Sequence, residues 1–127
     1  MRTGIVALAV MVVMAVPATA LAQTGRDVLA RCLAATKVLQ GRTSTRDEAD
    51  AGMWCIGYVS GMVDGITTMT SHLPSKKICI PPNGLSSEES VKIVTDWLMA
   101  NPGALAESGR SAVVIAIGTA FPCQAKR

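Results

Sequence analysis

The sequence has few aromatic residues and little excess charge. Its four aromatic side chains are Trp54, Tyr58, Trp97 and Phe121, and the formal net charge of the 127 residues is only +3. Nucleic acids are usually bound by stacked aromatic rings or by a strongly basic surface, so we expect no nucleic-acid partner. The chain is also too short for a Rossmann or barrel cofactor domain, and its length favours a single globular domain.

Metal-binding and redox motifs are missing as well. The sequence has one histidine, His72, and no Cys-x-x-Cys pair. Zinc sites and thioredoxin-type redox sites depend on closely spaced cysteine or histidine residues. No nucleophile, base and orienting group stand in a recognisable arrangement either. We therefore expect no metal, no cofactor and no catalytic residues, and we interpret the protein as a non-enzyme.

Long apolar runs are absent except at the N-terminus. Arg2 precedes an uncharged apolar stretch over residues 4–16, and Pro17 leads into the small residues that signal peptidases recognise. Residues 1–22 are therefore predicted to be a cleaved signal peptide. A membrane anchor is the alternative, but a spanning helix needs about 20 apolar residues and this run is shorter.

Two cleavage sites fit this segment, one before Leu21 and one before Gln23. The second is preferred because it leaves a polar mature N-terminus. Residues 23–127 would then form a single domain, exported to the periplasm and not attached to a membrane after cleavage. Such an oxidising compartment allows disulfide bonds to persist.

Cysteine usage agrees with export. The four cysteines, an even number, all follow the predicted signal peptide and are best interpreted as two structural disulfides: Cys32, Cys55, Cys79 and Cys123. Three pairings are possible for four cysteines. The choice among them depends on how the predicted helices are arranged.

The hydrophobic pattern predicts an all-α fold, a small four-helix, two-disulfide periplasmic domain. Apolar residues recur at three- and four-residue steps in helices expected over residues 25–40, 45–71, 86–100 and about 108–120. Thr45 with Glu48, and Ser86 with Glu89, have the spacing of capping boxes, in which each side chain bonds the other residue's amide. The last helix is apolar all round, which favours burial at the centre of the domain. A short strand over residues 113–117 is the competing interpretation.

Helix geometry then suggests which cysteines meet. If the first two helices form an antiparallel hairpin, Cys32 and Cys55 each lie about 12–15 Å from the shared turn and can face one another. Cys79 and Cys123 flank the outer ends of the last two helices, which would also be neighbours. We therefore predict the pairs Cys32–Cys55 and Cys79–Cys123, which would stabilise the fold by roughly 3.5 and 4 kcal/mol.

Three glycines recur at four-residue steps in the second predicted helix, namely Gly57, Gly61 and Gly65. Each lowers helix propensity by about 1 kcal/mol relative to alanine, which suggests that another segment approaches this face closely. We expect the apolar fourth helix to pack there. A homodimer formed across the glycines is the alternative.

Three short motifs resemble one protein family. They are the block from Cys55 to Gly65, the Cys79-Ile80-Pro81 triplet, and the Ala120-Phe121-Pro122-Cys123 terminus. Together they resemble the Rap/Tai family of periplasmic immunity proteins, which act against peptidoglycan amidase effectors of type VI secretion. The resemblance implies an all-helical, disulfide-bonded and often dimeric domain. It also implies a function without catalysis, in which the protein occludes the active site of a secreted amidase.

The surface expected to bind the amidase is the polar connector between the second and third predicted helices. It carries His72, Lys76, Lys77 and Asn83, and loops braced by a rigid scaffold commonly mediate recognition. An equally simple interpretation is a solvated loop without a partner. The alternative function is that of a general periplasmic interaction protein, or a chaperone-like helical protein, with no cognate effector.

Overall fold

The computed structural model describes residues 23–72 and 77–124, and the regular structure in these residues is helical. The helices are α1 (Gly25–Leu39), α2 (Arg46–His72), α3 (Ser87–Ala100) and α4 (Gly109–Ala120), with a short 3-10 turn, η2 (Pro102–Ala106), before α4. The prediction of an all-α domain with four helices and two disulfides is confirmed. The predicted signal peptide, residues 1–22, lies outside the described residues.

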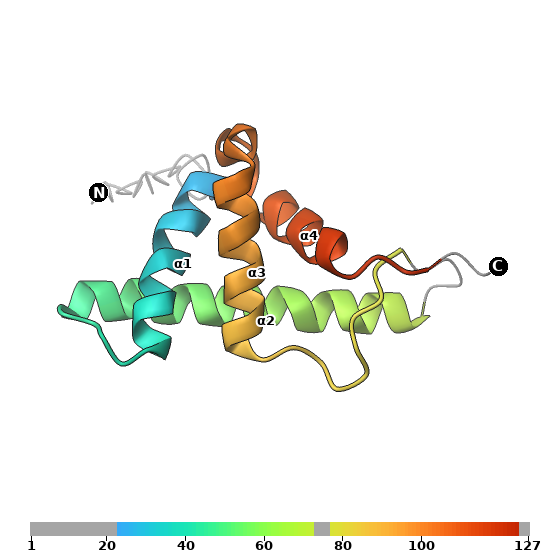
Figure 1. Ribbon diagram of the computed structural model, residues 1–127, viewed down its shortest axis with the longest axis horizontal. Coiled ribbons are helices and arrows are strands. Elements are labelled where there is room, and N and C mark those ends of the chain that lie inside the picture. The colour runs from blue at the N-terminus through green and yellow to red at the C-terminus, as the bar shows by residue number, and fades with distance from the viewer. Residues whose placement is uncertain (1–22, 73–76, 125–127) are drawn as a thin grey trace, which may run out of the picture.

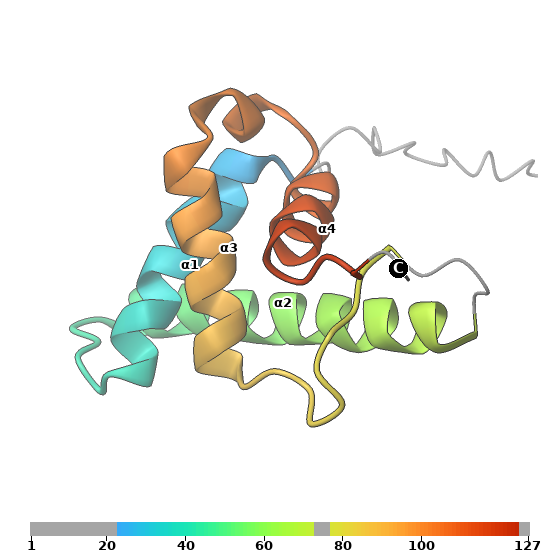
Figure 2. The same cartoon turned by 45° about the vertical axis from the view of Figure 1, so that its right-hand side comes forward.

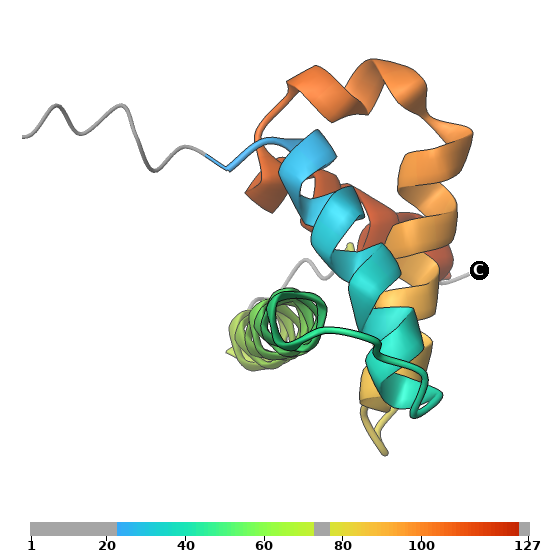
Figure 3. The ribbon, with the colours of Figure 1, turned by 90° about the vertical axis from the view of Figure 1, so that its left-hand side faces the viewer.

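The long helix α2 supports the three shorter helices. In Figure 1, α1 and α3 stand side by side and both cross α2 steeply. A view along α2 shows them on one side of it (Figure 3), and α4 lies beside α3 over the middle of α2 (Figure 2). One face of α2 therefore contributes to the core, while no helix of the described residues covers the opposite face.

All four helices contribute to a single apolar core. The buried side chains are mostly valine and alanine with a few larger residues: Val28, Cys32, Ala35, Cys55, Val59, Val63, Val91, Val94, Leu98, Ala112, Val113, Ala116 and Ile117. The expectation that α4 is buried all round is wrong, because Val114 is 36% exposed and Ile115 is 51% exposed. The helix packs one face against the core and leaves the other in solvent.

Both disulfides form as predicted. Cys32–Cys55 joins α1 to α2 with both residues fully buried, and Cys79–Cys123 joins the connector before α3 to the segment after α4. The predicted antiparallel hairpin of the first two helices is wrong, since α1 crosses α2 instead of running along it (Figure 1). The two cysteines meet because both lie where α1 crosses α2. They are also at similar distances from the turn between these helices, so the predicted pair is correct although the predicted hairpin is not.

The predicted cap at the start of α2 is half correct. The Thr45 hydroxyl accepts a hydrogen bond from the Glu48 amide at 3.1 Å. The Glu48 carboxylate, however, accepts from the Ser44 amide at 3.0 Å rather than from Thr45, and also from the Lys37 ammonium. The hydrogen bond from Lys37, followed by those from Ser44, lowers the pKa of Glu48 to about 2. This carboxylate thus links the end of α1 to the start of α2.

The intramolecular packing predicted at Gly57, Gly61 and Gly65 is wrong. A Cβ atom added at any of the three would meet nothing within 4 Å, because they lie on the uncovered side of α2. The close approach occurs at Gly52 instead, where a Cβ would lie 2.5 Å from Val38 Cγ2 of α1. A second copy seated on the exposed glycines stays a prediction.

Candidate functional site

The connector before α3 is fastened to the segment that follows α4. The Cys79 amide donates to the Phe121 carbonyl at 2.8 Å, and the Cys123 amide donates to the Lys77 carbonyl at 3.2 Å. With the Cys79–Cys123 disulfide, these hydrogen bonds hold one end of the connector in a fixed position. This end of the connector is therefore braced, as the sequence analysis expected.

The predicted partner-binding residues lie along this connector without converging on a cavity. His72 is the exposed last residue of α2, and Lys77 and Asn83 are exposed farther along. Asn83 sits in a turn closed by Gly84, which has a φ of +74° that favours glycine. Lys76 lies outside the described residues. None of the three that the structure describes lines either of the two clefts discussed below.

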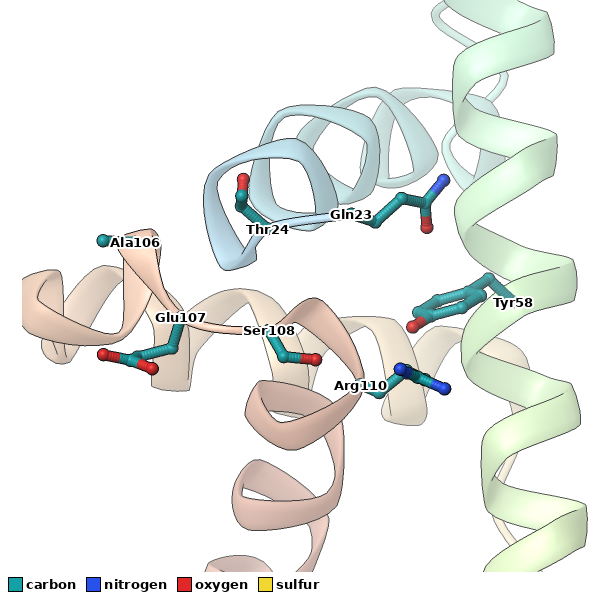
Figure 4. A pocket seen from close by; sticks show the side chains of 7 residues that line it. All are labelled: Gln23, Thr24, Tyr58, Ala106, Glu107, Ser108 and Arg110. Carbon is teal, nitrogen blue, oxygen red and sulfur yellow. The ribbon is translucent and has the colours of Figure 1, made fainter. Parts of the chain in front are cut away.

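The first cleft lies where the start of α1, the middle of α2 and the start of α4 meet (Figure 4). Its volume is about 540 Å³, and its lining residues are mostly polar: Gln23, Thr24, Tyr58, Ala106, Glu107, Ser108 and Arg110. Backbone hydrogen bonds hold the walls together, with the Gly109 amide donating to the Gln23 carbonyl at 2.7 Å. The sequence alone does not reveal this cleft, because its walls come from three segments that are distant along the chain.

Two side chains dominate the chemistry of this cleft. Tyr58 and Arg110 lie next to one another, whereas the carboxylate of Glu107 points away from both (Figure 4). Burial raises the pKa of Tyr58, and the nearby positive charge of Arg110 opposes this only in part. The phenol therefore stays protonated at neutral pH and can donate a hydrogen bond, so the cleft offers hydrogen bonds and a positive charge.

An aromatic stack fixes Tyr58 in place. The rings of Trp54 and Tyr58 are stacked with centroids 4.7 Å apart and an interplanar angle of 17°. On the other side of this stack, the Arg31 guanidinium carbon lies 4.3 Å from the centroid of the Trp54 ring. Such stacking and cation–π contacts give each side chain a preferred orientation. Tyr58, which is part of the motif that suggested the family, therefore has a structural contact that the sequence did not reveal.

The second cleft is a groove between α1 and α3 with a volume of about 780 Å³. It is lined by aliphatic, hydroxyl and charged side chains: Leu33, Thr36, Lys37, Leu39, Gln40, Glu88, Val91, Lys92, Thr95, Asp96 and Met99. We call it the α1–α3 groove. Its apolar contact area comes from Leu33, Leu39 and Met99, which are exposed.

Neither cleft carries an arrangement typical of metal chemistry. In residues 23–72 and 77–124, no three His, Cys, Asp or Glu side chains are grouped so that they could hold a metal ion. All four cysteines are paired, so none provides a free thiol. Within the same residues, no helix has both the length and the hydropathy needed to cross a bilayer.

Comparison with known proteins identifies the family. The chain matches the family of Rap1a immunity proteins over residues 24–123, a region that includes all four helices and both disulfides. Comparisons with curated proteins and with solved structures gave no match. The resemblance inferred from the cysteine and glycine motifs is therefore confirmed, and the chain belongs to the Rap1a immunity protein family.

Proposed function

We propose that this immunity protein acts in the periplasm, where it binds a secreted peptidoglycan amidase and occludes its active site without catalysing a reaction. The family match over residues 24–123 is the observation that carries the proposal. The two disulfides support an exported protein, since such bonds persist in oxidising compartments. The amidase as target follows from the resemblance of the motifs to the Rap/Tai family.

The connector is the surface proposed to meet the amidase. Lys77 and Asn83 are exposed there, and the Cys79–Cys123 disulfide holds one end of the connector in place. A braced loop loses less conformational entropy on binding than a free one, which favours affinity. Its lysines would also steer the protein towards an acidic surface around the amidase active site.

The function is tested by inhibition of purified amidases. Residues 23–127 would be produced in the periplasm, mixed with secreted amidases encoded beside the gene, and assayed for loss of peptidoglycan cleavage. Inhibition at stoichiometric concentrations is expected. If none of these amidases binds or loses activity, the proposed target is wrong and a general interaction role becomes the better interpretation.

The connector is tested by reversing its charge. The double variant Lys76→Glu/Lys77→Glu should weaken amidase binding about tenfold or more, while the free energy of unfolding stays within about 0.5 kcal/mol of the wild type. The matched control is Arg42→Glu/Arg46→Glu, which makes the same charge change at two exposed positions, one in the loop before α2 and one at the first residue of α2. Equal dissociation constants for the connector variant and the wild type would remove the connector from the interface.

A further inference from the structure

The walls of the first cleft are fastened to one another. The Gly25 amide at the start of α1 donates to the Glu107 carbonyl at 2.9 Å. A Cβ atom added at Gly109 would lie 2.7 Å from Val28 Cγ2, so glycine lets the start of α4 approach α1 this closely. The side chains that line the cleft therefore extend from fixed backbone positions, which lowers the entropy lost on binding.

Three segments of the chain place hydrogen-bond donors around this cleft. The Tyr58 hydroxyl lies between the side chains of Gln23 and Arg110 (Figure 4). Burial raises the pKa of Tyr58, so this hydroxyl is protonated at neutral pH. None of the ion pairs in the described part of the chain includes Arg110, and the Ser108 hydroxyl makes no capping hydrogen bond to α4. These donors are available to a ligand that supplies acceptors.

The charges around the cleft favour a carboxylate as that ligand. Of the lining residues, Arg110 alone is cationic, and its planar guanidinium can donate two parallel hydrogen bonds to the two oxygens of a carboxylate. Glu107 also lines the cleft, and although its carboxylate points away, its negative charge opposes a dianion more strongly than a monoanion. The hydration energy that an ion loses grows with the square of its charge, so one guanidinium compensates a carboxylate better than a phosphate.

The cleft opens at the molecular surface. Glu107, Ser108 and Arg110 are exposed, and Tyr58 is partly exposed. The volume of about 540 Å³ is within the range of about 300–1,000 Å³ that is typical of ligand sites. A side chain that projects from another protein can therefore enter the cleft.

We propose that the first cleft binds the carboxylate of an aspartate or glutamate side chain on a partner protein. The Arg110 guanidinium donates to both carboxylate oxygens, and the Tyr58 hydroxyl donates to one of them. The stack with Trp54, at 4.7 Å between ring centroids, holds the phenol in this orientation. The inference goes beyond the proposed function, since the partner need not be an amidase.

The test is an NMR titration of residues 23–127 with both disulfides intact. The probe is an acetylated and amidated pentapeptide with a central glutamate between glycines, and its control has glutamine instead. Saturable binding of the glutamate peptide in about the millimolar range is expected, with shifts confined to residues of the cleft such as Tyr58, Ser108 and Arg110. The glutamine peptide should bind at least about fivefold more weakly. Sodium acetate should shift the same residues with lower affinity than the peptide, and inorganic phosphate should bind more weakly than acetate.

Three variants separate the roles of the side chains. Arg110→Gln should weaken binding of the glutamate peptide at least about fivefold, whereas Arg42→Gln, exposed beyond the opposite end of α1, should change it by less than about twofold. Tyr58→Phe keeps the ring that stacks on Trp54 and should weaken binding about three- to tenfold through the lost hydroxyl. Glu107→Gln removes a negative charge from the cleft and should strengthen binding about twofold.

Three results would overturn the proposal. The first is that the glutamate and glutamine peptides bind equally well, or that neither binds. The second is that Arg110→Gln or Tyr58→Phe binds the glutamate peptide as tightly as the wild type does. The third is that phosphate or acetate binds more tightly than the peptide, which would identify a free anion as the occupant of the cleft.

Discussion

Replacing Thr95 by valine should stabilise the protein, because it removes a buried hydroxyl without a hydrogen-bond partner. The side chain is 5% exposed, so the hydroxyl has lost its water on folding and gained nothing in the described residues. Valine has almost the same shape and about the same helix propensity as threonine, so the helix itself should be unaffected. An unpaired buried hydroxyl costs about 1–3 kcal/mol. We therefore expect the free energy of unfolding to rise by about 1–2 kcal/mol.

The change can be measured by urea unfolding followed by circular dichroism, with both disulfides intact. For a domain of this size, each kcal/mol should raise the Tm by about 4–8 °C, so a thermal melt provides a second reading. The urea dependence of the free energy should keep its slope, since the surface exposed on unfolding is nearly unchanged. A midpoint shift at constant slope is thus the expected result.

Thr36→Val serves as the control for this prediction. The Thr36 hydroxyl already donates to the Cys32 carbonyl at 3.2 Å, so its removal should leave stability unchanged or lower it by up to about 1 kcal/mol. The reasoning is refuted if Thr95→Val is no more stable than the wild type, or if the two variants behave alike. Either outcome would mean that the Thr95 hydroxyl is satisfied in the free protein.

Two further predictions concern packing and charge. Gly52→Ala should destabilise the protein, because its Cβ would lie 2.5 Å from Val38 Cγ2, whereas Gly61→Ala in open space should stabilise it by about 1 kcal/mol. Urea unfolding measures both, and a dimer seated on the exposed glycines would cancel the second effect. The Lys37 hydrogen bond lowers the pKa of Glu48 to about 2 from 4.5, so the stability contributed by Glu48 is fully present above about pH 4.5 and is lost as the pH falls towards 2. In the variant Glu48→Gln, the free energy of unfolding should depend less on pH between about 4.5 and 2. If this pH dependence is the same as in the wild type, Glu48 is not the group responsible for it.

The contact surfaces of this immunity protein differ in their chemistry. The connector is exposed and is braced at one end by a disulfide, whereas the α1–α3 groove combines exposed apolar side chains with charged ones. The connector lies between α2 and α3, whereas the groove is formed by α1 and α3, so a substitution in one should leave binding at the other unchanged. Binding assays with variants of Lys77 and Met99 would therefore test which of the two surfaces the proposed amidase contacts.

The sequence by itself determined the helices and the cysteine pairs. Helix ends depend on groups within about four residues of one another, such as the Ser86 hydroxyl that accepts from the Glu89 amide at 3.1 Å. The pairs Cys32–Cys55 and Cys79–Cys123 were predicted correctly from positions along the predicted helices, although the antiparallel hairpin assumed for the first pair is wrong. The family motifs could be recognised for the same reason, since they are runs of neighbouring residues around the cysteines.

Only the tertiary structure decided which helix faces are covered. Periodicity places Gly57, Gly61 and Gly65 on one face of α2, but the steep crossing of α1 puts the close contact at Gly52 instead. The burial of Thr95 likewise depends on how α3 packs against α1. The sequence of α3 alone does not predict this packing. Caps and helix propensities act between neighbours in the chain, whereas burial depends on the angles at which distant helices cross.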